Sequence, residues 1–247
     1  MTSKTNNSPE SVSLERIVPA ELSPNEATGA ETLRFHMARY EFAKRHTVPG
    51  TLLDIACGVG YGTSYLAADH KITEAMGVDI SDSAVSYARQ RYASERISYL
   101  CSDALAFSSD RRFDNIISLE TIEHVDDPRA FFAHLVSLLA PKGRLAASVP
   151  ITPSVDANPH HKSNFSAKSF KAIASGFPLT YLDSMIQVQP FNPVSVGLRK
   201  EQRAQNLRTN LPWFYLKHPS HFALRLWSTL RDGFVNKYIT IVWEQAK

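Results

Sequence analysis

Asp54-Ile-Ala56-Cys57-Gly58-Val-Gly60-Tyr-Gly62 is the stretch that decides the fold of this 247-residue chain. It overlaps an apolar run at residues 51–56, TLLDIA, which is typical of a strand buried inside a parallel sheet. Residues 63–69 then predict a helix. Glycines in such a turn allow positive φ and let the backbone approach a ligand closely. Because ligands of open α/β sheets lie beyond the carboxyl ends of the strands, we expect this turn to form a ligand site.

The residues around the glycines indicate what kind of ligand the turn binds. A dinucleotide-binding turn would place its last glycine at position 63, where this chain has Thr63. Asp54 precedes the glycines, and its carboxylate would repel a pyrophosphate but attract a cationic amino or sulfonium group. We therefore favour a cationic ligand. A glycine-rich turn without a ligand and a nicotinamide dehydrogenase remain as alternatives at this point.

Strands and helices alternate outward from this turn. Four more strands are predicted at residues 74–79, 97–103, 113–120 and 143–150. Helices are predicted at residues 31–46, after an N-cap at Ser81, and from Asp126-Asp127-Pro128 to about residue 139, with a break at Pro141-Lys142-Gly143. The alternation predicts right-handed βαβ units and a parallel sheet. A helix at 166–176 and strands at 179–189 and 237–245 follow.

Acidic residues stand near the carboxyl end of each of the next three predicted strands. Asp79 lies 25 residues after Asp54, where a carboxylate can accept hydrogen bonds from two ribose hydroxyls. Asp103 follows Ser102 at a position suited to an adenine amino group, and Glu120 ends the fourth strand. One acid after a strand is usually a helix cap or a solvated turn. Four such ends in order predict one binding edge.

The segments LLDIACGVGYG, MGVDIS, SDAL, FDNIISLETIEHVDDP and APKGRLAASVP resemble, in order and spacing, the motifs of class I S-adenosylmethionine-dependent methyltransferases. The resemblance covers residues 31–150. It implies an α/β fold, namely a doubly wound, Rossmann-like, seven-stranded, mostly parallel sheet with an antiparallel last strand. Residues 179–189 and 238–245 would supply the final, reversed hairpin.

The same resemblance implies S-adenosyl-L-methionine as the cofactor and assigns residues to it. Its methionine part would lie against the first turn, at Asp54, Ala56, Cys57, Gly58 and Gly60. Ribose and adenine would contact Asp79, Ile80, Asp103 and Ala104, and Glu120 would form the floor of the site. Ala56 departs mildly from the pattern, since many members have glycine there.

A narrower resemblance links the chain to methyltransferases of surface-polysaccharide and glycolipid biosynthesis. Glu15-Arg16-Ile17-Val18-Pro19 is similar to an E-R-F-x-P stretch of that group, with Ile in place of Phe. Residues 36–40, His36 to Tyr40, match an H-x-x-x-Y pattern loosely. This resemblance implies a sugar or lipid-linked acceptor.

Three histidines are candidates for catalysis at the acceptor. His124 follows the fourth predicted strand and could act as a general base, a role worth roughly 10²- to 10⁴-fold, or could order the loop. His160 and His161 lie in the loop after the fifth strand, where an acceptor would enter. Adjacent histidines on an extended chain point in different directions, so we expect no metal site.

The sequence predicts a flexible N-terminal arm at residues 1–30 and a methyltransferase domain at 31–247, whose cofactor half would be 31–150. Residues 190–237 contain eight Lys or Arg against two acids, so this basic, aromatic segment carries +6 and the remainder −3. The segment could bind an anionic or sugar acceptor, lie on a membrane, or form a structural cap or dimer contact. No nucleic-acid partner is expected, because the basic patch is local.

No apolar run reaches the roughly 18 residues of a membrane span, and two cysteines cannot form a disulfide framework. We therefore expect a cytoplasmic protein with a peripheral membrane contact as an option; the oligomeric state stays open. The predicted function is O-methylation of a sugar, glycolipid or other small-molecule hydroxyl. A quinone-type or natural-product O- or N-methyltransferase is the alternative, and a non-catalytic S-adenosylmethionine-binding sensor or subunit is the alternative from another class.

Overall fold

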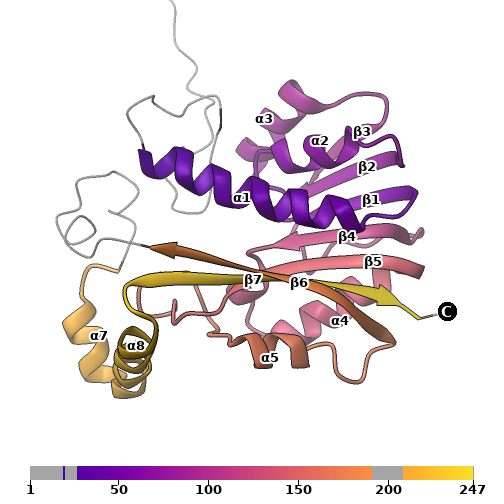
Figure 1. Ribbon diagram of the computed structural model, residues 1–247. Helices are drawn as coiled ribbons and strands as arrows, with labels where there is room; N and C mark the ends of the chain where they lie inside the picture. The colour runs from indigo at the N-terminus through magenta and orange to yellow at the C-terminus, as the bar shows by residue number, and fades with distance from the viewer. Residues whose placement is uncertain (1–18, 20–26, 191–207, 247) are drawn as a thin grey trace, which may run out of the picture.

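The computed structural model describes residue 19, residues 27–190 and residues 208–246, and its core is one seven-stranded sheet (Figure 1). The strand order is β3-β2-β1-β4-β5-β7-β6. Neighbouring strands from β3 to β5 pair in parallel, whereas β7 runs antiparallel to both β5 and β6. The strands are β1 Gly50–Ile55, β2 Ile72–Asp79, β3 Ile97–Cys101, β4 Phe113–Leu119, β5 Leu139–Pro150, β6 Leu179–Pro190 and β7 Val235–Gln245. The expected mostly parallel sheet with a reversed last strand is confirmed.

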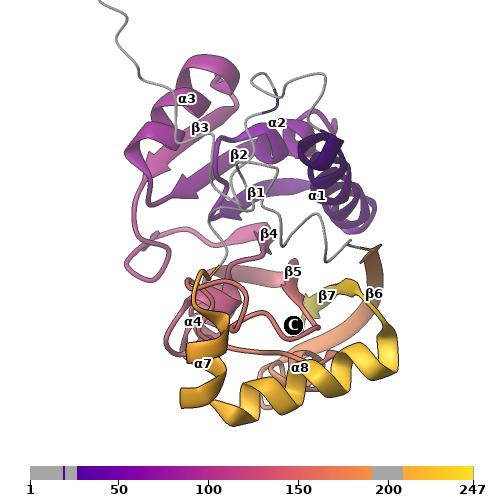
Figure 2. The same ribbon diagram turned by 90° about the vertical axis from the view of Figure 1, so that its left-hand side faces the viewer.

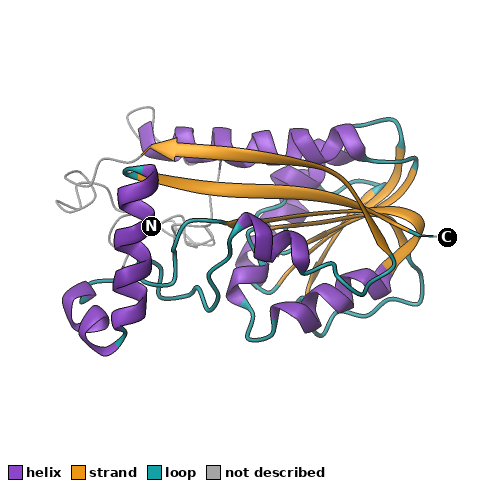
Figure 3. Cartoon of the chain, turned by 60° about the horizontal axis from the view of Figure 1, so that its bottom comes forward, coloured by secondary structure: helices purple, strands orange, loops and turns teal. Residues whose placement is uncertain are grey.

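Helices cover both faces of this sheet (Figure 3). They are α1 Ala27–His46, α2 Tyr61–Ala67, α3 Asp82–Tyr92, α4 Pro128–Leu138, α5 Ala167–Ala172, α7 Leu211–Lys217 and α8 Pro219–Asp232, with the short 3₁₀ helix η2 Ile122–His124. Adjacent residues of β1 face opposite layers: Leu52 packs with residues of α1 and α2, and Leu53 packs with residues of α4. Residues 52–55 are consequently all buried, as expected for a central parallel strand.

Local signals start α3 and α4 where the sequence predicts. The Ser81 hydroxyl accepts a hydrogen bond from the Ala84 amide and caps α3. Asp127 caps α4 by accepting from the amides of Arg129 and Ala130. These caps place the start of each helix close to the carboxyl end of the preceding strand, which is the edge that carries the predicted site.

Several predicted boundaries differ from the structure, above all those of β5 and α5. Strand β5 begins at Leu139 and runs through the predicted break, because Leu139 pairs with Phe113 before the register shifts to Asn115 opposite Arg144. The extra residues form a bulge in which Lys142 takes a φ of 63°. Helix α5 ends at Ala172 rather than at Gly176.

The predicted N-terminal arm and the basic segment lie partly outside the described residues. Helix α1 begins at Ala27, inside the predicted arm, while residues 1–18 and 20–26, which include most of the E-R-F-x-P-like stretch, lie outside the described part. In the basic segment, residues 191–207 also lie outside it. Its described part forms α7 and α8, which lie together near β6 and β7 and away from α2 and α3 (Figures 1 and 2).

Candidate active site

The turn after β1 surrounds a buried carboxylate. Asp54 is 1% exposed, and its Oδ2 accepts hydrogen bonds from Thr63 Oγ1 at 2.7 Å and from the Tyr40 hydroxyl at 3.4 Å. Its Oδ1 has no hydrogen-bond partner among the described residues. Burial raises the pKa of Asp54 to about 7, although the two hydrogen bonds act to lower it. A cationic donor placed at Oδ1 would satisfy this oxygen and favour the charged form.

The glycine turn has the backbone geometry of a close approach. Ala56, Gly58 and Gly60 have φ values of 62°, 57° and 82°. A Cβ added at Gly58 would meet no atom within 4 Å, so this glycine faces open space. A Cβ at Gly60 would overlap the Tyr99 ring at 2.6 Å. Gly58 therefore suits an approaching ligand, whereas Gly60 permits tight packing onto β3. The Cys57 side chain is also buried against Tyr99, so a ligand could meet Cys57 only through its backbone.

The end of β2 is tied to this turn through Asp79. Its Oδ2 accepts from the Gly58 amide at 2.8 Å, and its Oδ1 accepts from the Ser81 amide at 2.9 Å. Each carboxylate oxygen can accept a second hydrogen bond, so these contacts leave capacity for hydroxyl donors. Ile80 beside it is 70% exposed, as expected of a residue that would cover a ring.

The predicted residues of β3 lie at the same sheet edge, because β3 pairs with β2. Asp103 is exposed, and its Oδ1 accepts from the Leu105 amide at 2.8 Å. Ala104 is half-buried. The strand order thus brings Asp54, Asp79 and Asp103 to three adjacent strand ends.

Glu120, after β4, lies in a polar network with Ser148 and Arg39, neither of which was predicted from the sequence. It takes a φ of 51°, and its Oε1 accepts from Ser148 Oγ at 2.7 Å. The guanidinium of Arg39 lies 3.9 Å from its Oε2. Arg39 is 2% exposed and stacks on the Tyr238 ring, 4.5 Å from the ring centroid. One signal for Arg39 was available: it precedes the buried Phe42 and Ala43 by three and four residues, on the apolar face of α1.

Three further side chains meet beside Glu120. The ligand atoms of Glu123, His124 and His161 all lie within 4.8 Å of one another. The rings of His124 and His161 contact edge to face, with centroids 4.6 Å apart. Glu123 is fully buried, and the sequence analysis gave it no role. His160 is exposed and contributes its carbonyl oxygen, which accepts from His124 Nδ1 at 3.2 Å. The structure therefore brings together two of the three predicted histidines.

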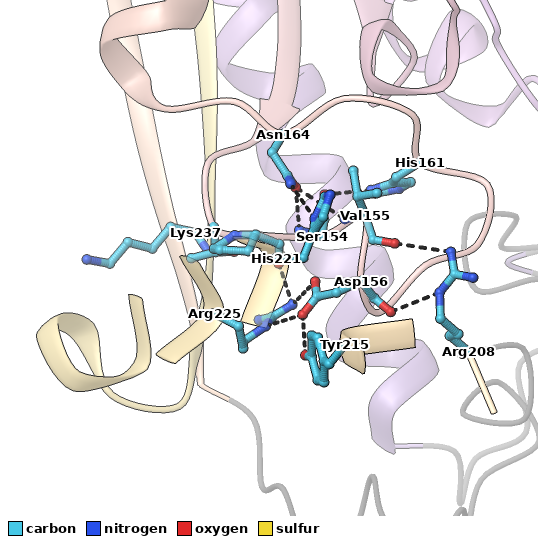
Figure 4. Close-up of polar contacts among 12 residues, drawn as sticks. Ser154, Val155, Asp156, His161, Asn164, Arg208, Tyr215, His221, Arg225 and Lys237 are labelled. Atoms are coloured by element: carbon cyan, nitrogen blue, oxygen red, sulfur yellow. Dashed lines mark hydrogen bonds and ion pairs between the residues drawn. The ribbon is translucent and has the colours of Figure 1, made fainter. Parts of the chain in front are cut away.

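Helices α7 and α8 are anchored to the loop after β5 by one buried acid (Figure 4). Asp156 is 1% exposed; Arg225 donates to both of its oxygens at 2.7 Å, and the Tyr215 hydroxyl donates to Oδ2 at 2.6 Å. Burial acts to raise the pKa of Asp156, but the Arg225 guanidinium and the Tyr215 hydroxyl hold it below its ordinary value. Part of the basic segment is thus a cap fastened to the loop that carries His161.

The outer surface of this cap is apolar. Its exposed large side chains are Trp213, Leu216, Phe222, Leu224, Leu226, Trp227, Leu230 and Phe234. Asp232 is the only acid between Arg208 and Lys237. Among the described residues, no helix combines the length and the apolar character needed to cross a bilayer.

Comparisons with known proteins agree with this architecture. A family model described as a methyltransferase domain matches residues 53–147, which run from β1 into β5. The chain carries a class I S-adenosylmethionine-dependent methyltransferase domain. A ubiquinone biosynthesis O-methyltransferase of Coxiella burnetii is 34% identical over 97 residues, which are 38% of this chain and 41% of the relative. A malonyl-[acyl-carrier protein] O-methyltransferase of Anoxybacillus flavithermus is 32% identical over 100 residues, or 40% of this chain and 39% of the relative.

The fold likeness extends over nearly the whole chain. The N-methyltransferase NodS of Bradyrhizobium japonicum, solved with S-adenosyl-L-homocysteine, superimposes with a TM-score of 0.56 at 17% identity. It covers 91% of this chain and 90% of its own. The chain spans less than half the length of the two curated relatives, so these matches concern the methyltransferase domain.

The residues of this chain fit S-adenosyl-L-methionine, the cofactor of the class. The unsatisfied Oδ1 of Asp54 would accept from the cationic amino group, and Gly58 leaves room for close approach. The Asp79 carboxylate, at the end of β2, would accept hydrogen bonds from ribose hydroxyls. The narrower resemblance to polysaccharide methyltransferases is not tested by these relatives. Of its residues, Tyr40 contacts Asp54, and His36 Nδ1 lies 2.9 Å from the Tyr61 hydroxyl.

Proposed function

We propose that the protein transfers the methyl group of S-adenosylmethionine to a hydroxyl of a small molecule, with a sugar or lipid-linked sugar as the acceptor class. The main support for an oxygen acceptor is the cluster of Glu123, His124 and His161 beside the cofactor edge. The relatives include O- and N-methyltransferases, so their names alone leave the accepting atom open. An amine can react as its free base, whereas a hydroxyl must lose its proton, and this cluster offers imidazoles for that task.

The bound cofactor would supply a methyl group that its sulfonium already activates. The chain's own residues would do the rest. Asp54 and Asp79 would hold the cofactor, and Glu120 would form the floor of its site. The acceptor oxygen would take the methyl group, and the electron pair of the broken carbon–sulfur bond would stay on sulfur. An imidazole of His124 or His161 takes the hydroxyl proton. Alignment alone can supply several kcal/mol.

A radiolabelled methyl-transfer screen tests the proposal. Purified full-length protein is offered nucleotide sugars, glycolipids, phenolic quinone precursors and amines. Methylation of a sugar or glycolipid hydroxyl is the expected result. Transfer only to phenols would support the quinone-type alternative, and transfer only to amines would overturn the oxygen acceptor. Cofactor binding without transfer to any acceptor would support a sensor or subunit.

His124→Ala gives a second test. We expect turnover to fall about 10²-fold or more while affinity for the cofactor stays within a few-fold, because we assign His124, which contacts the His160 carbonyl oxygen of the loop after β5, to the acceptor. Steady-state kinetics and calorimetry give the two values. Equal losses in both would indicate that His124 only orders the loop.

We also propose that the cap rests on an anionic membrane surface, where a lipid-linked acceptor would be found. Support comes from the exposed Trp213 and Trp227, the apolar side chains between them, and the excess of cations in this segment. We place the protein at the cytoplasmic side, where the free thiols of Cys57 and Cys101 stay reduced.

A further inference from the structure

Glu123, His124 and His161 come from two segments that the fold presses together. Glu123 and His124 are neighbours in η2, and His161 follows β5 by a long loop. The amides of Lys162 and Ser163 donate to the Glu123 carbonyl oxygen at 2.8 and 3.2 Å. These two backbone hydrogen bonds hold the loop that carries His161 against η2, so the three side chains meet.

Each imidazole is also oriented by a bond at its Nδ1. His124 Nδ1 donates to the His160 carbonyl oxygen at 3.2 Å, and a carbonyl oxygen can only accept. The proton of a neutral His124 is therefore on Nδ1, and the lone pair is on Nε2. His161 Nδ1 lies 2.7 Å from Ser154 Oγ. Outer bonds of this kind hold imidazoles that bind metals through the other nitrogen.

We propose that Glu123, His124 and His161 bind one divalent transition-metal ion, with Zn²⁺ as the reference ion. Two imidazoles and one carboxylate with an open fourth position form a catalytic zinc ligand set. Mg²⁺ and Ca²⁺ prefer oxygen ligands and suit this set poorly. Ligands at about 2.1 Å from a tetrahedral ion lie roughly 3.4 Å apart, so the side chains must close from separations of up to 4.8 Å.

From the sequence, His160 and His161 were the only pair weighed as metal ligands, and no metal site was expected. The structure instead pairs His161 with His124, which is 37 positions earlier, and adds a buried carboxylate. A carboxylate removed from water is stabilised by a nearby positive charge, which a divalent ion supplies together with two neutral imidazoles.

This inference rests on the proposed function for its chemical role. The acceptor hydroxyl would take the open position, where the ion lowers its pKa and its proton passes to water. The resulting alkoxide attacks the methyl carbon as the carbon–sulfur bond breaks, and the electron pair remains on sulfur. With the ion bound, the imidazoles are ligands, so the ion replaces them in promoting loss of the proton.

Metal binding is measured directly on the full-length, untagged protein. The protein is stripped with EDTA, dialysed, and titrated with Zn²⁺ in a calorimeter, and retained zinc is counted by mass spectrometry. We expect one Zn²⁺ per chain. His161→Ala and Glu123→Gln should each weaken binding more than tenfold. His160→Ala is the matched control, because the exposed imidazole is lost while its carbonyl oxygen remains, and its zinc affinity should equal that of the wild type.

The folding of each variant and its methyl-transfer activity are measured in separate experiments. Circular dichroism and binding of S-adenosylhomocysteine verify that each variant is folded. Absence of zinc binding by the wild type, or equal binding by folded His161→Ala, overturns the metal site and leaves the proposed function standing. Zinc binding that depends on His161, in a protein that methylates no acceptor, supports the site and contradicts the proposed function. Restoration of turnover by Zn²⁺ after EDTA supports both.

Discussion

Asp54 is a carboxylate whose burial favours the neutral form, although the cofactor needs the charged one. Burial raises the pKa of Asp54 from its ordinary value of 3.8 to about 7. The folded protein then binds this proton more tightly than the unfolded chain. Linkage predicts that the contribution of Asp54 to the free energy of unfolding falls as the pH rises from about 4 to about 7.

Cofactor affinity should have the opposite pH dependence. Below pH 7 a proton must leave Asp54 before the cationic amino group can bind, so affinity should fall about tenfold per pH unit. Calorimetric titration with S-adenosylhomocysteine between pH 5.5 and 8 measures this. Asp54→Asn should bind weakly with little pH dependence in that range. Identical profiles for wild type and variant would contradict the placement of the amino group at Asp54.

Asp79 gives a second prediction about a single residue. Asp79→Ala should weaken cofactor binding by about 2 to 3 kcal/mol, because ribose hydroxyls lose an acceptor and the Gly58 amide loses its partner. Asp103→Ala is the comparison, since Asp103 is exposed, and we expect a loss below about tenfold. Unchanged affinity of Asp79→Ala in the same calorimetric assay would refute the ribose assignment.

At the scale of elements, the cap and the acceptor loop form one connected unit. The Arg225 guanidinium and the Tyr215 hydroxyl bind Asp156, and Asn164 on the same loop lies 3.5 Å from His221 Nδ1 of α8 (Figure 4). Asn164 Oδ1 also accepts from the Ser154 amide, and Ser154 Oγ contacts His161. The position of α8 is therefore linked by direct contacts to the predicted catalytic imidazole.

Arg225→Met tests this connection. The variant leaves the Asp156 carboxylate buried without its cation, so we expect the free energy of unfolding to fall by about 3 to 5 kcal/mol. Hydrogen exchange of α7 and α8 should accelerate. Urea unfolding and exchange mass spectrometry provide the measurements. Arg231→Met is the matched control, because the Arg231 side chain is exposed and its partner Asp232 keeps a second cation, Lys237, so stability should change little. Equal effects would show that the buried pair does not anchor the cap.

Element boundaries show where local signals suffice. Ser81 and Asp127 begin their helices as predicted, since a cap depends on residues three or four positions apart. The start of β5 was missed because Pro141 and Gly143 break a helix, yet a bulged strand tolerates both. Only pairing with β4 decides between these outcomes, and β4 lies well upstream in the chain.

At the scale of the whole molecule, the exposed apolar side chains lie mainly on one part of the surface, which predicts binding to a membrane. The exposed aromatic residues Trp213, Phe222 and Trp227 belong to α7 and α8. These two helices lie near β6 and β7 (Figure 2). We expect the protein to float with vesicles that contain phosphatidylglycerol and to bind neutral phosphatidylcholine vesicles less well.

The double variant Trp213→Ser and Trp227→Ser should lose most of this binding. Leu105→Ser removes an exposed apolar side chain after β3 and should retain it. Flotation in a density gradient measures both. The membrane prediction is contradicted if the wild-type protein does not float or if the double variant floats equally. The apolar face would then be a structural cap or a dimer contact. Analytical ultracentrifugation would reveal a dimer.

From the sequence came the mostly parallel sheet, which the structure confirms, and the cofactor edge with the residues of the first turn, which stay predictions. These follow from strand periodicity, glycines and acids that act within a few positions of one another. Only the tertiary structure decided that His124 meets His161 and Glu123, that Arg39 approaches Glu120, and that Arg225 binds Asp156. The contacts His124–His161, Arg39–Glu120 and Arg225–Asp156 each join segments that are distant in the sequence. Their positions depend on how the loops after β4 and β5 pack against the sheet and the cap, which no local pattern encodes.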